Sequence, residues 1–181
     1  IKEFAAKIGF TKLIKKKFKT NDKAVRFHKD AENLLQIIYQ VISAYFQDDC
    51  ADELTLDPVF QAILEKESLA SQPTLSRFFN RMDEDTLIQF DDIDKNLRNI
   101  IYSIKWPEHV FLDLDSTLFG TYGKQEGEGF NFHYQEHGYH PLLCYDGLTG
   151  DLIKAEFRDG TLYCSNGADK FMKSIFREYL E

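Results

Sequence analysis

FLDLDST, residues 111–117, decides the expected fold of the C-terminal half of this chain. An apolar run that begins at Val110 and ends on two acids is typical of a buried strand. Because side chains at positions i and i+2 of a strand point to the same side, the carboxylates of Asp113 and Asp115 should share one side of a sheet. Ionised groups beside a buried strand are costly unless they are paired or coordinated. We therefore expect these acids to bind a metal or transfer a proton; the plainer alternative is that they bond to loop amides.

Downstream of this strand the sequence predicts a hairpin and a helix. A polar loop with spaced glycines comes first, and we expect it to be a flexible flap beside the strand. Its glycines are Gly120, Gly123, Gly127 and Gly129. Two strand-like runs follow at 139–145 and 152–157, and the turn sequence DGLTG at 146–150 should join them. A last amphipathic helix begins near 165–168.

Upstream of the strand, apolar side chains recur every three or four residues, which predicts helices. These helices are expected at 30–46, 57–67, 71–82 and from 83 to about 104, the last with apolar positions from Leu87 to Ile104. The helix at 71–82 should bury a stripe of four side chains, Leu75, Phe78, Phe79 and Met82. The chain is thus expected to be α+β, with an all-helical region at 1–106 and the strand, hairpin and helix at 107–181.

Composition favours an ordinary globular protein, with 181 residues of which 43% are hydrophobic. No stretch approaches the roughly 18 to 20 apolar residues of a membrane span, so the cytoplasm is the expected location and a membrane is not an expected partner. The three cysteines, Cys50, Cys144 and Cys164, are far apart and odd in number. This spacing favours buried thiols over a disulfide framework or a zinc knuckle.

Charge is distributed unevenly along the chain. Residues 1–30 hold ten Lys/Arg against three acids, a balance of +7, whereas the whole chain carries −8. A basic arm on an acidic body fits a protein that binds a polyanion at one end and divalent cations elsewhere. Lys15, Lys16 and Lys17 form the densest part of this arm. The alternative is a terminal helix whose charges only face solvent.

Two classes of enzyme compete for the DLDST motif at 113–117. It resembles the first motif of haloacid-dehalogenase-type phosphatases, in which Asp113 would be the nucleophile and Asp115 the general acid/base. That fold needs successive parallel strands, and the remaining sequence offers a hairpin where a crossover helix should come. The wider sequence therefore argues against the phosphatase reading.

Three separated segments instead resemble the DDE-type transposases of bacterial insertion sequences. They are LASQPTLSRF at 69–78, DLDST at 113–117, and HGYHPLL at 137–143 leading into DGLTGDL at 146–152. The resemblance spans roughly 30–181, and it implies that 107–181 is the first half of a ribonuclease-H-like catalytic domain. It also implies metal-dependent cleavage and strand transfer at the ends of a mobile element, with Asp115 as a catalytic ligand of Mg²⁺ or Mn²⁺.

The same resemblance sets limits on this chain. The family's second Asp and its Glu should lie beyond Glu181, so we expect an N-terminal portion that does not cleave DNA by itself. Double-stranded DNA, meaning terminal repeats and target, and a second copy of the protein are the implied partners, in the cytoplasm at a bacterial nucleoid. An edge beside the strand at 110–115 should favour self-association. A non-catalytic DNA-binding remnant of a transposase remains the third alternative.

The helix at 71–82 has the size of a DNA-recognition helix. Six polar side chains on it would be available to bases and phosphates, namely Gln72, Thr74, Ser76, Arg77, Asn80 and Arg81. The alternative is an amphipathic core helix whose polar face only meets water.

One histidine series needs a separate interpretation. His133, His137 and His140 have a spacing that suggests zinc, but no cysteine lies at ligand distance in the sequence. Phosphate contact or base stacking is the reading we prefer for these histidines.

Overall fold

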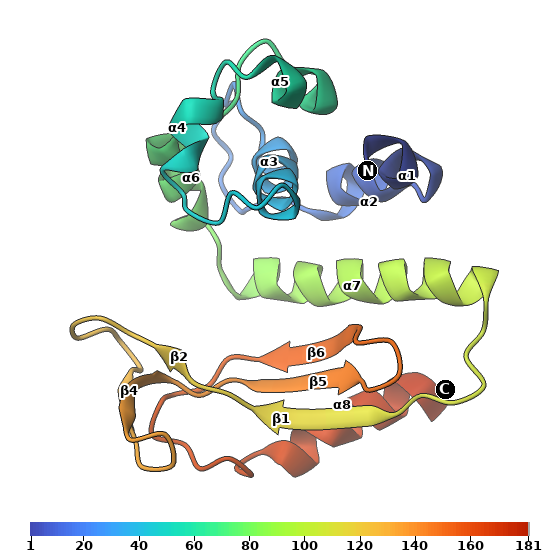
Figure 1. The fold of residues 1–181 in the computed structure, drawn as a ribbon, viewed down its shortest axis with the longest axis vertical. Coiled ribbons are helices and arrows are strands. Elements are labelled where there is room, and N and C mark those ends of the chain that lie inside the picture. The colour runs from blue at the N-terminus through green and yellow to red at the C-terminus, as the bar shows by residue number, and fades with distance from the viewer. Residues whose placement is uncertain (181) are drawn as a thin grey trace. The chain divides into compact units, whose positions relative to one another are not determined.

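Seven helices and then two small antiparallel sheets with one further helix make up the fold of the computed structural model, which describes residues 1–180. The chain divides into two units, Ile1–Ile104 and Lys105–Glu181, and each is considered by itself (Figure 1). The helices of the first unit are α1 (Lys2–Lys7), α2 (Phe10–Lys17), α3 (Asp30–Ile42), α4 (Cys50–Leu54), α5 (Pro58–Leu64), α6 (Gln72–Phe79) and α7 (Glu84–Ile104).

Local backbone chemistry sets where these helices begin and end. Asp57 caps α5, because its carboxylate accepts hydrogen bonds from the backbone N–H groups of Val59 at 2.9 Å and Phe60 at 2.8 Å. The helix ends at Leu64 because Glu65 adopts φ 56, earlier than the predicted end at residue 67. Helix α3 likewise ends at Ile42 and not at residue 46, with Ala44 in the left-handed region at φ 67.

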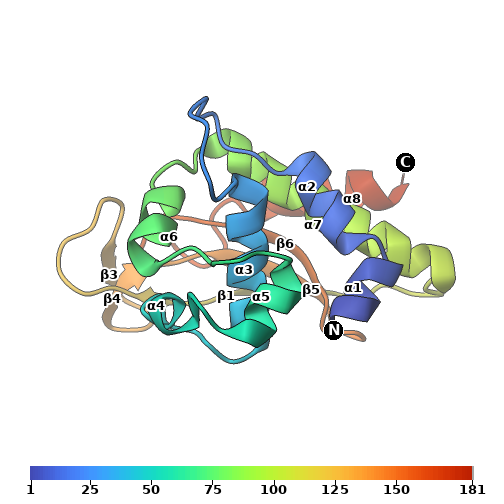
Figure 2. The ribbon, with the colours of Figure 1, turned by 90° about the horizontal axis from the view of Figure 1, so that it is seen from above.

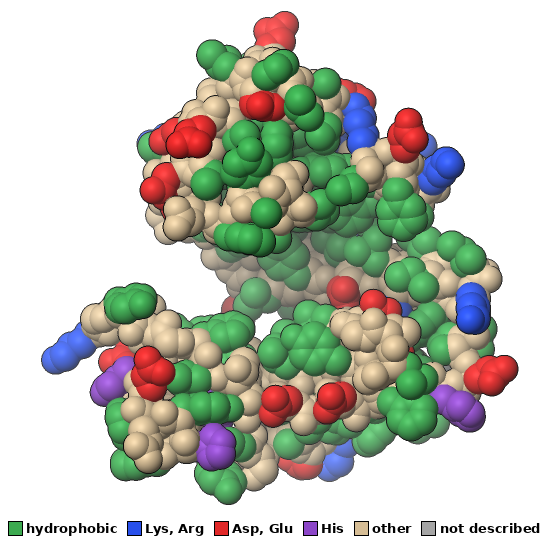
Figure 3. All heavy atoms as spheres, in the orientation of Figure 1, with side chains coloured by type: hydrophobic (Ala, Val, Ile, Leu, Met, Phe, Trp, Pro, Cys, Tyr) green, Lys and Arg blue, Asp and Glu red, His purple; other side chains and the backbone are tan. Residues whose placement is uncertain are grey.

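Helix α3 is at the centre of the first unit, in contact with α2, α5 and α6 (Figure 2). Phe78 of α6 is fully buried and packs edge-on against Phe18, with ring centroids 5.9 Å apart. The prediction that Phe79 is also buried was wrong, because 47% of its surface is exposed. Leu87 and Ile104, the first and last apolar positions predicted on α7, are exposed as well. Hydrophobic side chains therefore remain on the surface of this unit, as Figure 3 shows for one face.

The first sheet of the second unit has the strand order β1-β5-β6, all antiparallel. Its strands are β1 (Leu112–Ser116), β5 (Leu142–Asp146) and β6 (Leu152–Glu156), and the predicted hairpin is confirmed as β5–β6. Helix α8 (Ala168–Leu180) packs Phe171 and Ile175 against Leu142, Cys144 and Ile153. Within the part of the chain that the structure describes, β1 pairs with β5 alone and is an edge strand.

A second sheet replaces the predicted flap, with the strand order β2-β4-β3. It consists of β2 (Phe119–Gly120), β3 (Gly129–Asn131) and β4 (Glu136–Tyr139). The strand predicted at 139–145 is broken, because β4 ends before His140–Pro141 and β5 begins after them. Proline has no N–H to give to a ladder, and the chain changes sheets at this point. Gly138 of β4 allows the close approach of β2, since a Cβ at this position would lie 2.3 Å from the carbonyl oxygen of Phe119. The expectation of a flexible flap in this region was therefore wrong.

Two remaining expectations concern cysteines and membranes. Cys144 is buried as predicted, but Cys50 and Cys164 are only half-buried, so the expectation of three buried thiols was too broad. No helix among the described residues has the length and apolar character that crossing a membrane would need.

Candidate functional site

The carboxylates of Asp113 and Asp115 lie on one side of β1, as the alternation of a strand requires. Both side chains are exposed, whereas Leu112, Leu114 and Ser116 face the core. The strand was predicted to be buried, and this is confirmed only for the face that carries Leu112 and Leu114. Register places Asp113 beside Tyr145 and Asp115 beside Leu143 of β5. The acids thus stand on the face of the sheet opposite α8.

Neither acid is neutralised by a cation of the described residues. The Asp115 carboxylate accepts one hydrogen bond, from the backbone N–H of Ser116 at 2.8 Å, and Asp113 has no side-chain bond among residues 1–180. Carboxylate oxygens that are exposed and unpaired are the donors that Mg²⁺ and Mn²⁺ prefer. In the described part of the chain no group of three His, Cys, Asp or Glu side chains is placed to hold a metal. Asp113 and Asp115 are thus two neighbouring carboxylates on one exposed face of β1.

The strand directions bear on the phosphatase alternative. Asp113 and Asp115 lie on β1, whose neighbour β5 runs antiparallel to it. The sheet continues with the antiparallel β6. A nucleophile of the haloacid-dehalogenase type sits at the end of a strand in a parallel sheet. The geometry around these acids does not favour that alternative.

The histidine series does not converge on one point. His140 is fully buried, and its Nδ1 lies 2.8 Å from the carbonyl oxygen of Leu162. His137 is exposed and its Nδ1 lies 2.9 Å from the carboxylate of Glu128. His133 is exposed. His140 is thus part of the packing of the second unit.

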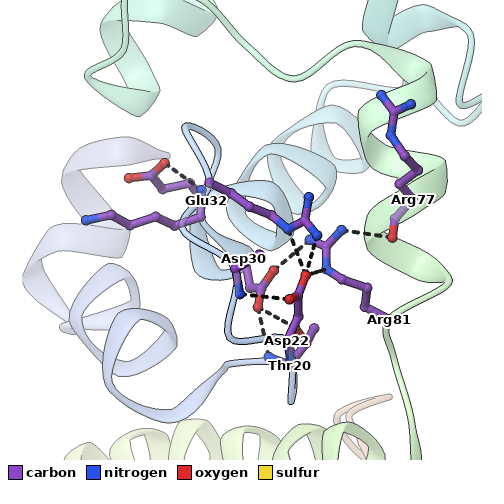
Figure 4. A network of polar contacts seen from close by, with 9 residues as sticks. Thr20, Asp22, Asp30, Glu32, Arg77 and Arg81 are labelled. Atoms are coloured by element: carbon purple, nitrogen blue, oxygen red, sulfur yellow. Dashed lines mark hydrogen bonds and ion pairs between the residues drawn. The ribbon is translucent and has the colours of Figure 1, made fainter.

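The six polar side chains of the predicted recognition helix have different surroundings. Ser76, Arg77 and Asn80 are exposed, whereas the Nε2 of Gln72 donates to the carboxylate of Asp48 at 2.8 Å. Thr74 Oγ1 lies 3.2 Å from the hydroxyl of Ser71. Arg77 makes no ion pair with any residue in 1–180, and Figure 4 shows its guanidinium pointing away from the neighbouring polar network.

Arg81 lies within that network and not on the open face of α6. Its guanidinium donates to Asp30 at 2.8 Å and to the backbone carbonyl of Arg77 at 2.9 Å, and its Nε lies 3.5 Å from the carboxylate of Asp22 (Figure 4). Asp30 also accepts hydrogen bonds from the N–H and hydroxyl of Thr20, at 2.9 and 2.6 Å. Arg81 therefore connects the end of α6 to the start of α3.

Hydrogen bonding governs the ionisation of these acids. Burial alone would raise the pKa of Asp30, but the hydrogen bonds from Thr20 and Arg81 outweigh it and hold the pKa below its ordinary value of 3.8. The pKa of Asp22 is lowered as well, by the backbone N–H of Ala24 and then by Arg26. Both carboxylates are consequently charged at neutral pH.

A stability test follows from Asp30. We expect Asp30→Asn to lower the free energy of unfolding of the helical unit by about 1.5–3 kcal/mol at pH 7, the range for hydrogen bonds to charged groups. Because the folded-state pKa is depressed, this contribution is full above pH 3.8 and is lost as the pH falls through the lower folded value. Urea unfolding at several pH values should show that the difference in free energy of unfolding between wild type and variant decreases below pH 3.8.

Glu53→Gln is the matched control, since it removes one negative charge from an exposed side chain of α4. It should change stability by less than about 0.5 kcal/mol at every pH. If the difference in free energy of unfolding between wild type and Asp30→Asn stayed constant down to pH 2, the assigned ionisation of Asp30 would be contradicted.

The three lysines of the basic arm lie on α2. Lys15 and Lys16 are exposed and make no ion pair within the described residues, whereas the Nζ of Lys17 lies 2.6 Å from the carboxylate of Asp92 on α7. Two of the three are thus free to meet a polyanion.

Sequence reasoning counted Arg26 only as one charge of the basic arm and assigned no role to His28 or Asn33. These three residues share a pocket with Arg77. The segment at 21–29 carries no helical or strand pattern, so it offered no signal of its own. Asn33 lies within a helical pattern, where a buried amide stands out only once its surroundings are known. The pocket brings together segments about 50 residues apart in the sequence.

A family model described as Transposase DDE domain group 1 matches residues 1–181. No curated protein and no solved structure matches the chain.

Proposed function

Because the chain belongs to the DDE-domain transposases of group 1, we propose that it serves the metal-dependent cleavage and strand transfer of DNA at the ends of a bacterial insertion sequence. The observation that carries this proposal is the pair of exposed, unpaired carboxylates on β1, Asp113 and Asp115. The packed back of the strand, against α8, holds them on a rigid support. The proposed substrate is double-stranded DNA.

Asp115 is the proposed catalytic ligand, with Asp113 as its neighbour on the same face. The chemistry that Mg²⁺ or Mn²⁺ supplies when bound is activation of the attacking water or 3′-hydroxyl and stabilisation of the leaving oxygen. The chain itself contributes the carboxylate oxygens and their orientation. The N–H of Ser116 fixes one oxygen of Asp115, which leaves the other free.

A ribonuclease-H-like domain is the fold that we propose for the second unit. The support is the order of strand, hairpin and helix, with β1, β5 and β6 in one sheet and α8 on one face. The sheet formed by β2, β3 and β4 is inserted between β1 and β5 in the chain order. We propose that the edge of β1 pairs with further protein, either in the complete fold or in a second copy.

The helical unit is the proposed DNA-binding part. Ser76 and Arg77 of α6, Asn80 at its C-terminal end, and Lys15 and Lys16 of α2 are exposed and are available to a duplex. Gln72, Thr74, Lys17 and Arg81 already have partners within the protein, so we propose for them the lesser role of shaping the surface. A protein that binds and cleaves chromosomal DNA would be located at the bacterial nucleoid.

The proposal is tested with the full-length gene product and a duplex that carries the element ends. We expect nicks at those ends with Mg²⁺ or Mn²⁺ and none when EDTA replaces the metal, because the carboxylates alone supply no electrophile. Denaturing gels of end-labelled duplex measure the nicks. Nicking that persists at the same rate in EDTA would refute metal-dependent chemistry. Duplex binding without any nicking would favour the non-catalytic alternative.

A further inference from the structure

A pocket of about 320 Å³ opens between the segment before α3 and the helix α6. Arg26, His28, Asn33, Thr74, Arg77 and Arg81 line it. No negatively charged side chain is among its lining residues, although the pocket lies next to the network of Asp22 and Asp30. Its chemistry is therefore that of a site for an anion.

Asn33 is the most unusual residue of this pocket. It is 1% exposed, and neither its amide oxygen nor its amide nitrogen has a hydrogen-bond partner. Buried amides in proteins are almost always bonded, so an orphaned one in the wall of a polar pocket indicates a missing partner. The Nε of Arg81, at the same site, makes no hydrogen bond either, but it lies 3.5 Å from the carboxylate of Asp22 and is paired with it. Asn33 is therefore the group of this pocket that lacks a partner.

The cations around the pocket are only partly neutralised. Arg81 is paired with Asp30 and Asp22, and Arg26 is paired with Asp22. Arg77 has no acidic partner within residues 1–180 and adds a full positive charge. Burial, followed by the charge of Lys66, lowers the pKa of His28, so this imidazole is neutral at pH 7 and can offer one N–H. Three arginines therefore line the cavity against the two neighbouring carboxylates of Asp22 and Asp30, which leaves a net positive charge around it.

We infer that this pocket holds a phosphate group of the DNA backbone, with Asn33 and Arg77 as its principal donors. This inference rests on the proposed function, because DNA is what supplies the phosphate. A phosphate offers several acceptor oxygens, which match the amide N–H₂ of Asn33 and the guanidinium of Arg77. Arg81 acts as a positioning residue, since its ion pairs hold the two walls of the pocket together.

The inference changes the role of α6. A bound phosphate in this pocket would fix the helix on the duplex at one backbone position, and Ser76 and Asn80 would then be the side chains left for base edges. Contacts to phosphate set orientation and register, whereas contacts to bases set specificity.

The test compares Asn33→Leu and Arg77→Gln with wild type in the full-length protein. Fluorescence anisotropy with a labelled duplex should show binding about tenfold weaker for each variant, the size expected for losing a hydrogen bond to a charged group. Arg77→Gln should also reduce the slope of log K against log salt by about one. The loss of affinity should be the same for any duplex sequence in both variants, because every sequence has the same phosphate backbone.

Asn33→Leu separates ligand binding from folding. Leucine keeps the branched skeleton of asparagine with the same number of side-chain heavy atoms, and it removes an amide that has no partner in the free protein. The gain from removing that amide offsets the larger methyl groups, so thermal stability should change little while DNA binding falls. The matched control is Gln40→Leu, on the same helix, which also removes a buried amide with an unbonded Nε2 but lies outside the pocket. It should bind DNA as wild type does.

Inorganic phosphate distinguishes the possible failures. Titration into ¹⁵N-labelled wild type should shift the side-chain amide resonances of Asn33, and Arg77→Gln should abolish that shift. Wild-type DNA binding that is unaffected by Asn33→Leu would overturn the inference and leave the proposed function standing. Phosphate-dependent shifts of Asn33 in a protein that binds no duplex would keep the anion site and overturn the proposed function instead.

Discussion

Replacement of Asp115 by Asn is expected to lower the rate of DNA nicking by the full-length protein about a thousandfold or more. The change removes one negative charge and little volume from an exposed position, so β1 and its packing against α8 should persist. Charge stabilisation by a metal contributes several kcal/mol to a transition state, and each 1.36 kcal/mol corresponds to a factor of about ten in rate. Single-turnover nicking of an end-labelled duplex with Mg²⁺ measures the effect. Duplex binding should not change.

Asp113→Asn is the matched control, because it makes the same chemical change two residues away on the same face. Loss of a carboxylate that only supports a metal ligand typically lowers activity by about ten- to a hundredfold. We therefore expect the nicking rate of Asp113→Asn to lie between those of wild type and Asp115→Asn. A phosphatase of the haloacid-dehalogenase type would give the reverse order, with hydrolysis of small phosphoesters abolished by Asp113→Asn. Unchanged nicking by Asp115→Asn would remove this residue from the proposed mechanism.

Phe78→Ala is expected to destabilise the helical unit by about 3–5 kcal/mol, the range for removing a large aromatic side chain from a core. Phe78 is fully buried, packs edge-on against Phe18 and also lies under Arg81, whose guanidinium carbon is 5.6 Å from the ring centroid. Loss of this ring would leave a cavity between α6 and the core. Hydrogen exchange of peptides from α3 and α6 should accelerate by orders of magnitude.

The neighbouring residue gives a sharp comparison. Phe79 has the same side chain and lies in the same helix, but 47% of its surface is exposed. Phe79→Ala should therefore cost less than about 1.5 kcal/mol and leave the exchange of α3 peptides near that of wild type. Equal destabilisation by the two substitutions would contradict the assigned orientation of α6.

Short-range patterns predicted most of the elements correctly. The helices at α3, α5, α6 and α7, the strand β1 and the hairpin β5–β6 each follow from a period or a cap that lies within a few residues. The ends were less predictable, because a left-handed residue such as Ala44 or Glu65 is selected by the packing of its neighbours. The sheet of β2, β3 and β4 was missed, since its strands are two to four residues long and alternate too briefly to produce a pattern.

The candidate site residues also divide into those that a local pattern predicts and those that depend on distant parts of the chain. Asp113 and Asp115 could be found because the i, i+2 relation on a strand is local. Arg81 could not be separated from Arg77, because its partner Asp30 is 51 positions away in the sequence. The missing partners of Asn33 depend on the whole surrounding structure, so no local pattern predicts them.

The close approach of backbones in the second unit has a consequence for sequence divergence among related chains. A methyl group at Gly160 would lie 1.8 Å from the carbonyl oxygen of Gly138, and one at Gly138 would lie 2.3 Å from that of Phe119. Neither position can therefore accept a side chain without a shift of the backbone beside it. Tyr134, from the turn between β3 and β4, donates its hydroxyl at 2.7 Å to the carbonyl of Ser116, the residue after Asp115. In related chains a side chain at either glycine would have to be accompanied by a shift of the backbone around it, and Tyr134 is the contact through which this sheet reaches the residue next to Asp115.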